Sequence, residues 1–245
     1  MEFQSTRGVH VTYHHTTFTP TALITGASAG LGRALTHALF DIGWHVIATA
    51  RHVDRLDRLR GDHVTTVVGD VTDPAHRAEL ATILTANGGL DLLVNNASTL
   101  GPSPMPHLAQ YPLDQLAAVY DVNVVAPLAL LQLALPALRS RDGVAVNITS
   151  DAAVMPYEGW GGYGSSKAAL DHLTAILAAE ESDVPIYSFD PGDMRTDMHQ
   201  AAFPGQDISD RPEPETVVPS LLRLIESRPP SGRYVGAQLE AEVTS

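Results

Sequence analysis

Residues Thr21-Ala22-Leu23-Ile24-Thr25-Gly26-Ala27-Ser28-Ala29-Gly30-Leu31-Gly32 are the strongest indication of the fold of this 245-residue chain. Its first five residues are mostly apolar or β-branched and predict a buried strand, and residues 29–42 follow the period of a helix. The glycines allow a tight turn in which backbone N–H groups approach a phosphate, which the helix dipole also favours. Because the turn falls between a strand and a helix, we interpret it as phosphate-binding rather than as a merely flexible loop.

Apolar runs alternate with longer segments of helical period along the rest of the chain. Strands are expected at 21–25, 44–50, 64–68, 90–94, 143–149, 185–189 and 233–235, and helices at 29–42, around Leu56, and at 74–87, 113–138, 162–181 and 215–227. This alternation predicts an α/β fold, a Rossmann-like doubly wound sheet of about seven mostly parallel strands with helices on both faces. We expect an N-terminal arm at 1–19, one domain at 20–245, and a polar, proline-bearing lid at about 197–215.

Composition argues against several classes of partner. A net charge of −13 disfavours nucleic acid and anionic lipid, and we find no apolar run that should span a membrane. The chain has no cysteine and its first residues lack the apolar core of a signal peptide, so a cytoplasmic location is expected. His14 and His15 have no third candidate ligand nearby, and no metal site is predicted.

The single lysine, Lys167, stands four residues after Tyr163 in a predicted helix. At that spacing the two side chains lie on one face, where a cation favours the phenolate form of a tyrosine. The pair could therefore exchange a proton with a substrate. Taken alone, it could equally be a chance spacing in an arginine-rich chain.

Together these features resemble the short-chain dehydrogenase/reductase family in its compact, single-domain form. The glycine turn matches at Thr25, Gly26, Gly30 and Gly32, and the family's Asn-Asn-Ala motif is matched by residues 95–97. Further matches follow in the family's order at Asn123, Ser150, Tyr163, Lys167, Pro191, Gly192 and Thr196. Two departures are Ser98, where glycine is usual, and Asp151, where a small residue is common.

The resemblance implies an oxidoreductase of ketoreductase type that interconverts a ketone or aldehyde and an alcohol by hydride transfer. It implies that Tyr163 is the acid/base, that Ser150 positions the substrate oxygen, and that Lys167 lowers the pKa of Tyr163 and holds the nicotinamide ribose. Asn123 would support a proton-relay water, although it could instead satisfy a local backbone group. The residues expected to bind the cofactor are Gly26, Ser28, Gly30, Leu31, Gly32, Arg51, Asp70, Val71, Asn96, Ala97, Tyr163, Lys167, Pro191, Gly192, Met194 and Thr196.

The end of the second predicted strand indicates which cofactor is used. An NAD site usually has an acidic residue there for the ribose 2′-hydroxyl, whereas this chain has Ala50 followed by Arg51. An arginine suits the 2′-phosphate of NADP(H), which is the expected cofactor, although Arg51 could simply face solvent. Asp70 could contact the adenine or could cap a turn.

The substrate and the assembly are less strongly indicated. Met155, Tyr157, Trp160 and Met198, with Met194 and Phe203, could line a site for an apolar or aromatic substrate, or could be ordinary packing. The helix expected at 113–138 is apolar on much of its circumference and must be buried, either in the core or between subunits. Because the family commonly pairs this helix across a dimer face, the resemblance predicts a homodimer or homotetramer.

Three alternative functions share some of these features. A nicotinamide-binding regulator or scaffold could use the same fold without catalysis. A nucleotide-sugar epimerase or dehydratase shares the Tyr-Lys pair, but it generally has another glycine spacing and a longer C-terminal domain than follows Pro191. A serine-nucleophile enzyme would need a Gly-x-Ser-x-Gly elbow, and Ser150 is flanked by Thr149 and Asp151.

Overall fold

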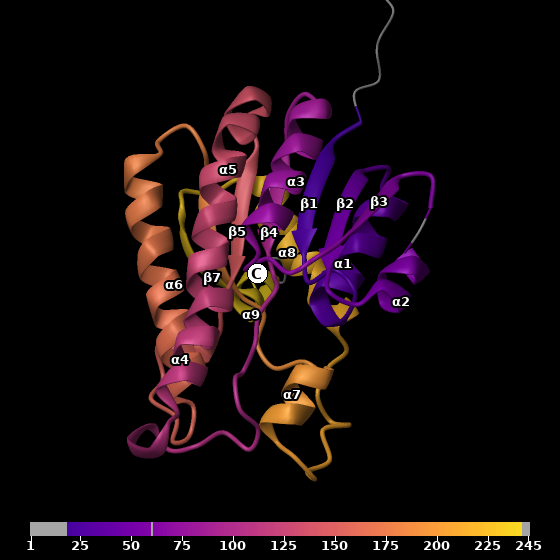
Figure 1. The fold of residues 1–245 in the computed structure, drawn as a ribbon. Coiled ribbons are helices and arrows are strands. Elements are labelled where there is room, and N and C mark those ends of the chain that lie inside the picture. The colour runs from indigo at the N-terminus through magenta and orange to yellow at the C-terminus, as the bar shows by residue number, and fades with distance from the viewer. Residues whose placement is uncertain (1–18, 60, 242–245) are drawn as a thin grey trace, which may run out of the picture.

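The structure, a computed structural model, describes residues 19–59 and 61–241, so the expected N-terminal arm lies outside the described residues apart from residue 19. Its strands form one seven-stranded sheet in the order β3-β2-β1-β4-β5-β6-β7, and every pair is parallel. The strands are β1 (Thr21–Thr25), β2 (His45–Ala50), β3 (Val64–Val68), β4 (Leu92–Asn95), β5 (Val144–Ile148), β6 (Ile186–Asp190) and β7 (Gly232–Val235). The predicted fold class is confirmed, and all seven carboxyl ends share one edge (Figure 1).

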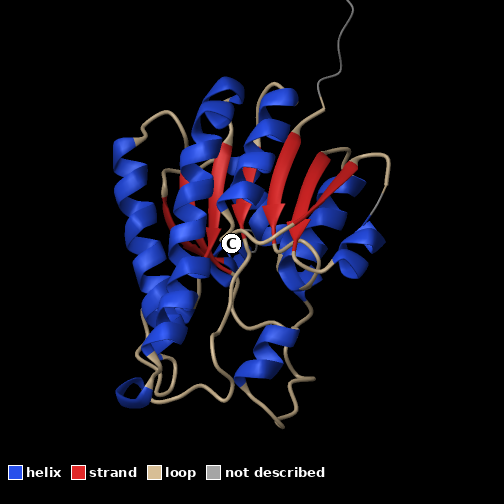
Figure 2. Cartoon of the chain, viewed as in Figure 1, coloured by secondary structure: helices blue, strands red, loops and turns tan. Residues whose placement is uncertain are grey.

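Helices cover both faces of the sheet (Figure 2). On one face lie α1 (Gly30–Asp41) and α8 (Val218–Ser227), and on the other α3 (Pro74–Ala86), α5 (Ala126–Arg141) and α6 (Gly161–Glu180). Successive strand residues point to opposite faces, so Ile24 packs in the same core as Leu35, whereas Leu23 packs in the same core as Leu130. The strands are therefore buried on both sides, which explains their nearly continuous apolar sequence.

The helix expected at 113–138 extends from 113 to 141 and has three parts. They are α4 (Leu113–Tyr120), a π-helical turn (Asp121–Val125) and α5, which contains Pro136. By length and composition this stretch could cross a membrane, so the expectation that no apolar run should span one is wrong. Leu130, Leu131 and Leu138 are nevertheless buried in the core of the sheet, as in a core helix of the same composition.

Three short helices complete the described part of the chain. A helix at Leu56 was expected and is α2 (Val53–Leu56), whereas α7 (Asp197–Ala202) and α9 (Gly236–Ala241) were not expected. Helix α7 opens the segment predicted as a lid and lies beyond the carboxyl edge of the sheet (Figure 1). Its sequence is too short and polar to show a helical period, but Thr196 caps it by accepting a hydrogen bond from the His199 N–H at 3.1 Å.

Candidate active site

The glycine turn after β1 is locked to the segment after β4. Thr25 Oγ1 accepts hydrogen bonds from the N–H groups of Asn96 and Ala97, both at 3.0 Å. Asn96 Nδ2 donates to the carbonyls of Thr25 at 2.9 Å and Gly26 at 3.2 Å. Gly26 and Gly30 have positive φ angles of 64° and 50°, which glycine adopts without strain. These contacts join β1 to β4, where the strand order reverses and α/β folds bind their ligands.

Gly32 has a different task from the first two glycines. It does not line the cavity described below, and a Cβ there would lie 2.5 Å from both Asn96 Nδ2 and the Gly26 carbonyl oxygen. Its expected place among the cofactor contacts is therefore indirect, because it allows α1 to approach the turn closely. No side chain caps the N-terminus of α1, which leaves its first N–H groups facing the turn.

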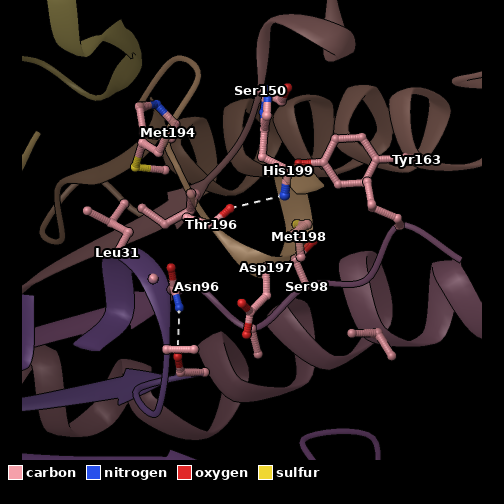
Figure 3. Close-up of a pocket in the computed structure, with 18 of the residues that line it drawn as sticks. Leu31, Asn96, Ser98, Ser150, Tyr163, Met194, Thr196, Asp197, Met198 and His199 are labelled. Carbon is pink, nitrogen blue, oxygen red and sulfur yellow. Dashed lines mark hydrogen bonds between the residues drawn. The ribbon is translucent and has the colours of Figure 1, made fainter. Parts of the chain in front are cut away.

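A cavity of about 390 Å³ extends from this turn along the carboxyl edge of the sheet. Apart from Gly32, every residue expected to bind the cofactor lines it, and so does Ser150. Leu31, Asn96, Met194 and Thr196 lie near one another on one side, and Ser150 and Tyr163 lie on the other (Figure 3). The structure thus gathers residues that are far apart in the chain, from Gly26 to Ala202, into one elongated site.

Tyr163 and Lys167 lie on the buried side of α6. The Lys167 ammonium is 5.5 Å from the centre of the Tyr163 ring and donates a hydrogen bond to the Ile148 carbonyl at 2.8 Å. The hydroxyls of Ser150 and Ser98 lie close enough to the Tyr163 phenol to lower its pKa. Ser150, which follows β5, therefore lies beside the phenol of α6.

Burial changes both ionisable groups in the direction of their neutral forms. It raises the pKa of Tyr163 well above its usual value, against the effect of the Ser150 hydrogen bond, and Asp190 and Asp151 add to the rise. Burial likewise lowers the pKa of Lys167 to about 8, although Asp171 opposes this. Desolvation is therefore the largest effect on the phenol, and the expectation that Lys167 lowers its pKa stays a prediction.

Asn123 is fully buried in the π-helical turn and does not line the cavity. Its Oδ1 accepts from the Thr99 N–H and the Ser98 hydroxyl, and its Nδ2 donates to the Thr99 carbonyl and the Ser166 hydroxyl. All four hydrogen-bonding positions of the side-chain amide are thereby used. Its side chain holds the loop after β4 against α6, so any contact with a relay water falls to its backbone.

The far end of the cavity carries positive charge. Arg51 lines it with its side chain 64% exposed, and its guanidinium is 3.9 Å from the Asp70 carboxylate. Asp70 also accepts hydrogen bonds from the N–H and hydroxyl of Thr72, so it caps a turn as well as lining the cavity. Arg55 is a further cation in this lining that sequence analysis did not single out, and it pairs with Asp197 at 2.9 Å.

The expected substrate residues are only partly brought together. Trp160 and Met198 line the cavity beside Leu100 and Ala202, whereas Met155 and Tyr157 are 50% and 44% exposed and lie outside it. Phe203 stacks against Trp160 and His199 behind the lining. Met155 and Tyr157 fail to reach the cavity because the chain after Ser150 turns outward in a short 3-10 helix (Asp151–Ala153).

Other lining residues were missed or not understood from sequence. Asp193 and His199 bring ionisable groups from the segment after β6, and Met198 and His199 of α7 stand in front of the cavity (Figure 3). Ser98 and Asp151 were noticed only as departures from the family pattern, yet one meets Tyr163 and the other receives a hydrogen bond from Ser150 at 3.0 Å. Their departure from the family pattern was the only sign in the sequence that these two residues contribute to the site.

The cavity fits a nicotinamide dinucleotide in the chemistry of its lining. Gly26 and Gly30 leave backbone N–H groups open, which suits a pyrophosphate. A Cβ at Gly26 would approach Ala97 within 2.9 Å, so a larger residue would disturb the turn. Arg51 and Asp70 would face the adenosine of a bound dinucleotide, and Tyr163 and Lys167 its nicotinamide. Among the described residues, no cluster of side chains could hold a metal ion.

Comparisons with known proteins agree with this geometry. A sequence profile described as short chain dehydrogenase matches residues 20–207. The chain is 35% identical over 185 residues to serine 3-dehydrogenase of Rhizobium radiobacter, covering 73% of each protein. It is 34% identical over 184 residues to benzil reductase ((S)-benzoin forming) of Bacillus subtilis, covering 72% of this chain and 75% of the reductase. Among solved structures, a short chain dehydrogenase of Escherichia coli CFT073 complexed with NADPH superimposes with a TM-score of 0.83 at 27% identity, covering 89% and 96% of the two chains.

Proposed function

Because the chain belongs to the short-chain dehydrogenase family and is an oxidoreductase, we propose that it is an NADP(H)-dependent enzyme of ketoreductase type. Its reaction would interconvert a ketone or aldehyde and an alcohol. The observation that carries the proposal is the meeting of Ser150, Tyr163 and Lys167 at one end of the cavity that begins at the glycine turn.

The proposed roles follow from the contacts of these side chains. Tyr163 gives a proton to the carbonyl oxygen or takes one from the alcohol, and Ser150 holds that oxygen beside the phenol. Burial keeps Tyr163 in its protonated form, which is the form that donates during reduction. Lys167, fixed by the Ile148 carbonyl, places its charge near the phenol and would hold the ribose of the nicotinamide. The bound nicotinamide supplies or accepts the hydride.

Asn123 has an indirect part in this proposal. Its side chain fixes Ser98 and the loop that contacts Tyr163, while the π-helical turn interrupts the regular backbone bonding of the helix. A carbonyl freed by such a turn could hold the relay water beside Lys167. Asn123 is therefore proposed to support the proton relay through its backbone and through Ser98, rather than through its amide.

A preference for NADP(H) is supported by Arg51 and by the solved relative complexed with NADPH. A planar guanidinium can donate two hydrogen bonds to a phosphate, and no acidic side chain occupies the end of β2, where Ala50 stands. Titration of the protein with NADPH and NADH, followed by nicotinamide fluorescence, tests this preference. Arg51→Asp should weaken NADPH binding by about tenfold or more while leaving NADH binding largely intact. Equal binding of both cofactors by the wild type would contradict it.

The acid/base assignment is tested with Tyr163→Phe. This variant should bind NADPH as the wild type does, because the ring is retained, and should lose turnover of ketones by a factor of about 10² to 10⁴, the usual worth of a general acid. Turnover retained at the wild-type rate would refute the proposed role. Wild-type protein that binds NADPH but reduces no carbonyl compound would instead favour a nicotinamide-binding regulator.

The substrate, the assembly and the location are also proposals. Trp160, Met198 and Leu100 support an apolar or aromatic substrate. Val125 just before α5, Leu133 on α5 and Ile176 on α6 are large apolar side chains left more than 40% exposed, which supports pairing of these helices in a homodimer or homotetramer. A monomer in sedimentation at micromolar concentration would contradict that pairing. A cytoplasmic location is proposed on the absence of cysteine alone.

A further inference from the structure

Asp151 places a carboxylate directly beside the proposed substrate oxygen. Its Oδ1 accepts a hydrogen bond from the Ser150 hydroxyl at 3.0 Å, and its Oδ2 accepts one from the Tyr157 hydroxyl at 2.7 Å. The side chain lines the cavity and is only partly exposed. The roles proposed so far make no use of this residue.

The contact with Asp151 occupies the only proton that Ser150 can donate. A hydroxyl has one donor and two acceptor positions, and Ser150 also accepts from the Ala152 N–H at 3.2 Å and lies beside the Tyr163 phenol. A ketone oxygen entering the site must therefore compete with Asp151 for the Ser150 proton. An ionised carboxylate is the stronger acceptor, so a plain ketone is at a disadvantage.

Neighbouring carboxylates are already compensated, whereas Asp151 is not. Asp190 is held by Arg233 at 2.7 Å, and Asp193 lies 3.7 Å from Arg211 and 3.8 Å from His199. Among the residues that the structure describes, Asp151 receives only the two hydroxyl donors and has no cationic partner. It therefore retains negative charge and acceptor capacity at the substrate end of the cavity.

A donor on the substrate itself would resolve the competition. Oxygen or nitrogen atoms on adjacent carbons lie about 2.8 Å apart when gauche, close to one hydrogen-bond length. With the reacting oxygen at Ser150, a neighbouring hydroxyl or ammonium group falls within reach of Asp151 Oδ1. We propose that Asp151 selects ketones and alcohols that carry an amino or hydroxyl group on the carbon next to the reacting one, an inference that rests on the proposed function. That group binds Asp151 in place of the Ser150 hydroxyl, which then turns to the reacting oxygen.

Matched pairs of small molecules test the selectivity. We would measure NADPH consumption with 2-hydroxyacetophenone and with propiophenone, which differ by a hydroxyl in place of a methyl group. Because the hydroxyl also activates the ketone electronically, the quantity of interest is the ratio of the two kcat/KM values in the wild type against the same ratio in Asp151→Ala. Tyr157→Phe is the control, since it removes the other donor to Asp151 and leaves the carboxylate in place.

The ratio should fall about tenfold or more in Asp151→Ala, the worth of one charge-assisted hydrogen bond, and should be kept in Tyr157→Phe. In Asp151→Ala, kcat/KM should fall for 2-hydroxyacetophenone and should rise for propiophenone, because the Ser150 hydroxyl is released from Asp151. Asp151→Asn, which keeps an acceptor but not the charge, should fall between the two. NADPH titration by fluorescence shows whether each variant retains a folded cofactor site. An unchanged ratio in Asp151→Ala would overturn the inference.

A binding measurement separates this inference from the proposed function. Isothermal titration of the NADP-loaded protein compares 2-amino-1-phenylethanol with 1-phenylpropan-1-ol, which differ by an ammonium in place of a methyl group. Tighter binding of the amino alcohol in the wild type, lost in Asp151→Ala, supports the inference even if no ketone is turned over. The absence of turnover would by itself refute only the proposed function. Equal binding of the two alcohols by the wild type would overturn it.

Discussion

Replacing Gly32 with alanine should disturb the junction between the glycine turn and β4. Gly32 lies in the first turn of α1, and its φ angle is one that alanine also adopts. The substitution therefore adds a methyl group without backbone strain. That methyl would stand 2.5 Å from the Gly26 carbonyl oxygen and 2.5 Å from Asn96 Nδ2.

The expected loss of stability follows from those contacts. Each pair of atoms must separate by about 0.9 Å to reach 3.4 Å, the lower limit of ordinary contact, and neither partner is a free side-chain end. Moving Asn96 weakens its hydrogen bonds to the Thr25 and Gly26 carbonyls, at about 1 kcal/mol each. Overpacking adds about 1–3 kcal/mol. Alanine regains about 1 kcal/mol of helix propensity, so we expect a net loss of about 2–4 kcal/mol in the free energy of unfolding.

Urea unfolding followed by circular dichroism measures this loss, and NADPH titration by fluorescence measures its effect on the site. NADPH binding should weaken by about tenfold as the turn moves. Gly61→Ala is the control, because it too adds a methyl without a positive φ, and the nearest atom, on Phe40, is 3.6 Å away. It should change stability by less than about 0.5 kcal/mol. If Gly32→Ala matches this control in both stability and NADPH affinity, the reasoning about close packing is refuted.

Two further predictions concern buried charge. Burial lowers the pKa of Lys167 from 10.5 to about 8, so the unfolded chain binds the lysine proton more tightly than the folded chain does. This difference destabilises the folded state, fully below pH 8, and the destabilisation disappears as the pH rises to 10.5. Lys167→Met should therefore lose turnover. At pH 7 its free energy of unfolding, measured with urea, should exceed that of the wild type by about 1–3 kcal/mol, and this difference should vanish by pH 10. A variant less stable than the wild type at pH 7 would contradict this. Arg233→Met leaves the buried Asp190 carboxylate without its cation and should lower the free energy of unfolding by about 3–5 kcal/mol, measured by urea. Arg195→Ala, at an exposed ion pair, should cost less than about 1 kcal/mol, and equal losses in the two variants would refute the role of burial.

Local sequence predicted the frame of the site because each part is a short-range pattern. The strand at 21–25 matches its predicted bounds, and the fold brings Gly26, Asn96, Ser150 and Tyr163 to one cavity, as their positions after strands and in a helix imply. Elements without a pattern were missed. Helix α7 has six residues, too few to show a period, and its cap at Thr196 had been interpreted only as a cofactor contact.

Residues that depend on the path of a loop were placed less well. Met155 and Tyr157 are apolar or aromatic and close in sequence to Ser150, but the turn after Ser150 directs them away from the cavity. The same turn brings Tyr157 to Asp151, a contact that no spacing rule would suggest. Residues that are close in sequence to a catalytic residue lie near it along the backbone, but their side chains need not point in the same direction.

Residue type and regular spacing are enough to predict the alternation of strands and helices, the phosphate-binding turn and the residues proposed to exchange the proton. The protonation tendencies and the hydrogen-bond partners depend instead on how the chain folds. The pKa of Tyr163 rises because of what surrounds the phenol, and the Ser150 proton is directed to Asp151 by the fold of the chain around both. Desolvation and hydrogen-bond direction are properties of neighbours brought together in space, and neither can be obtained from the order of residues alone.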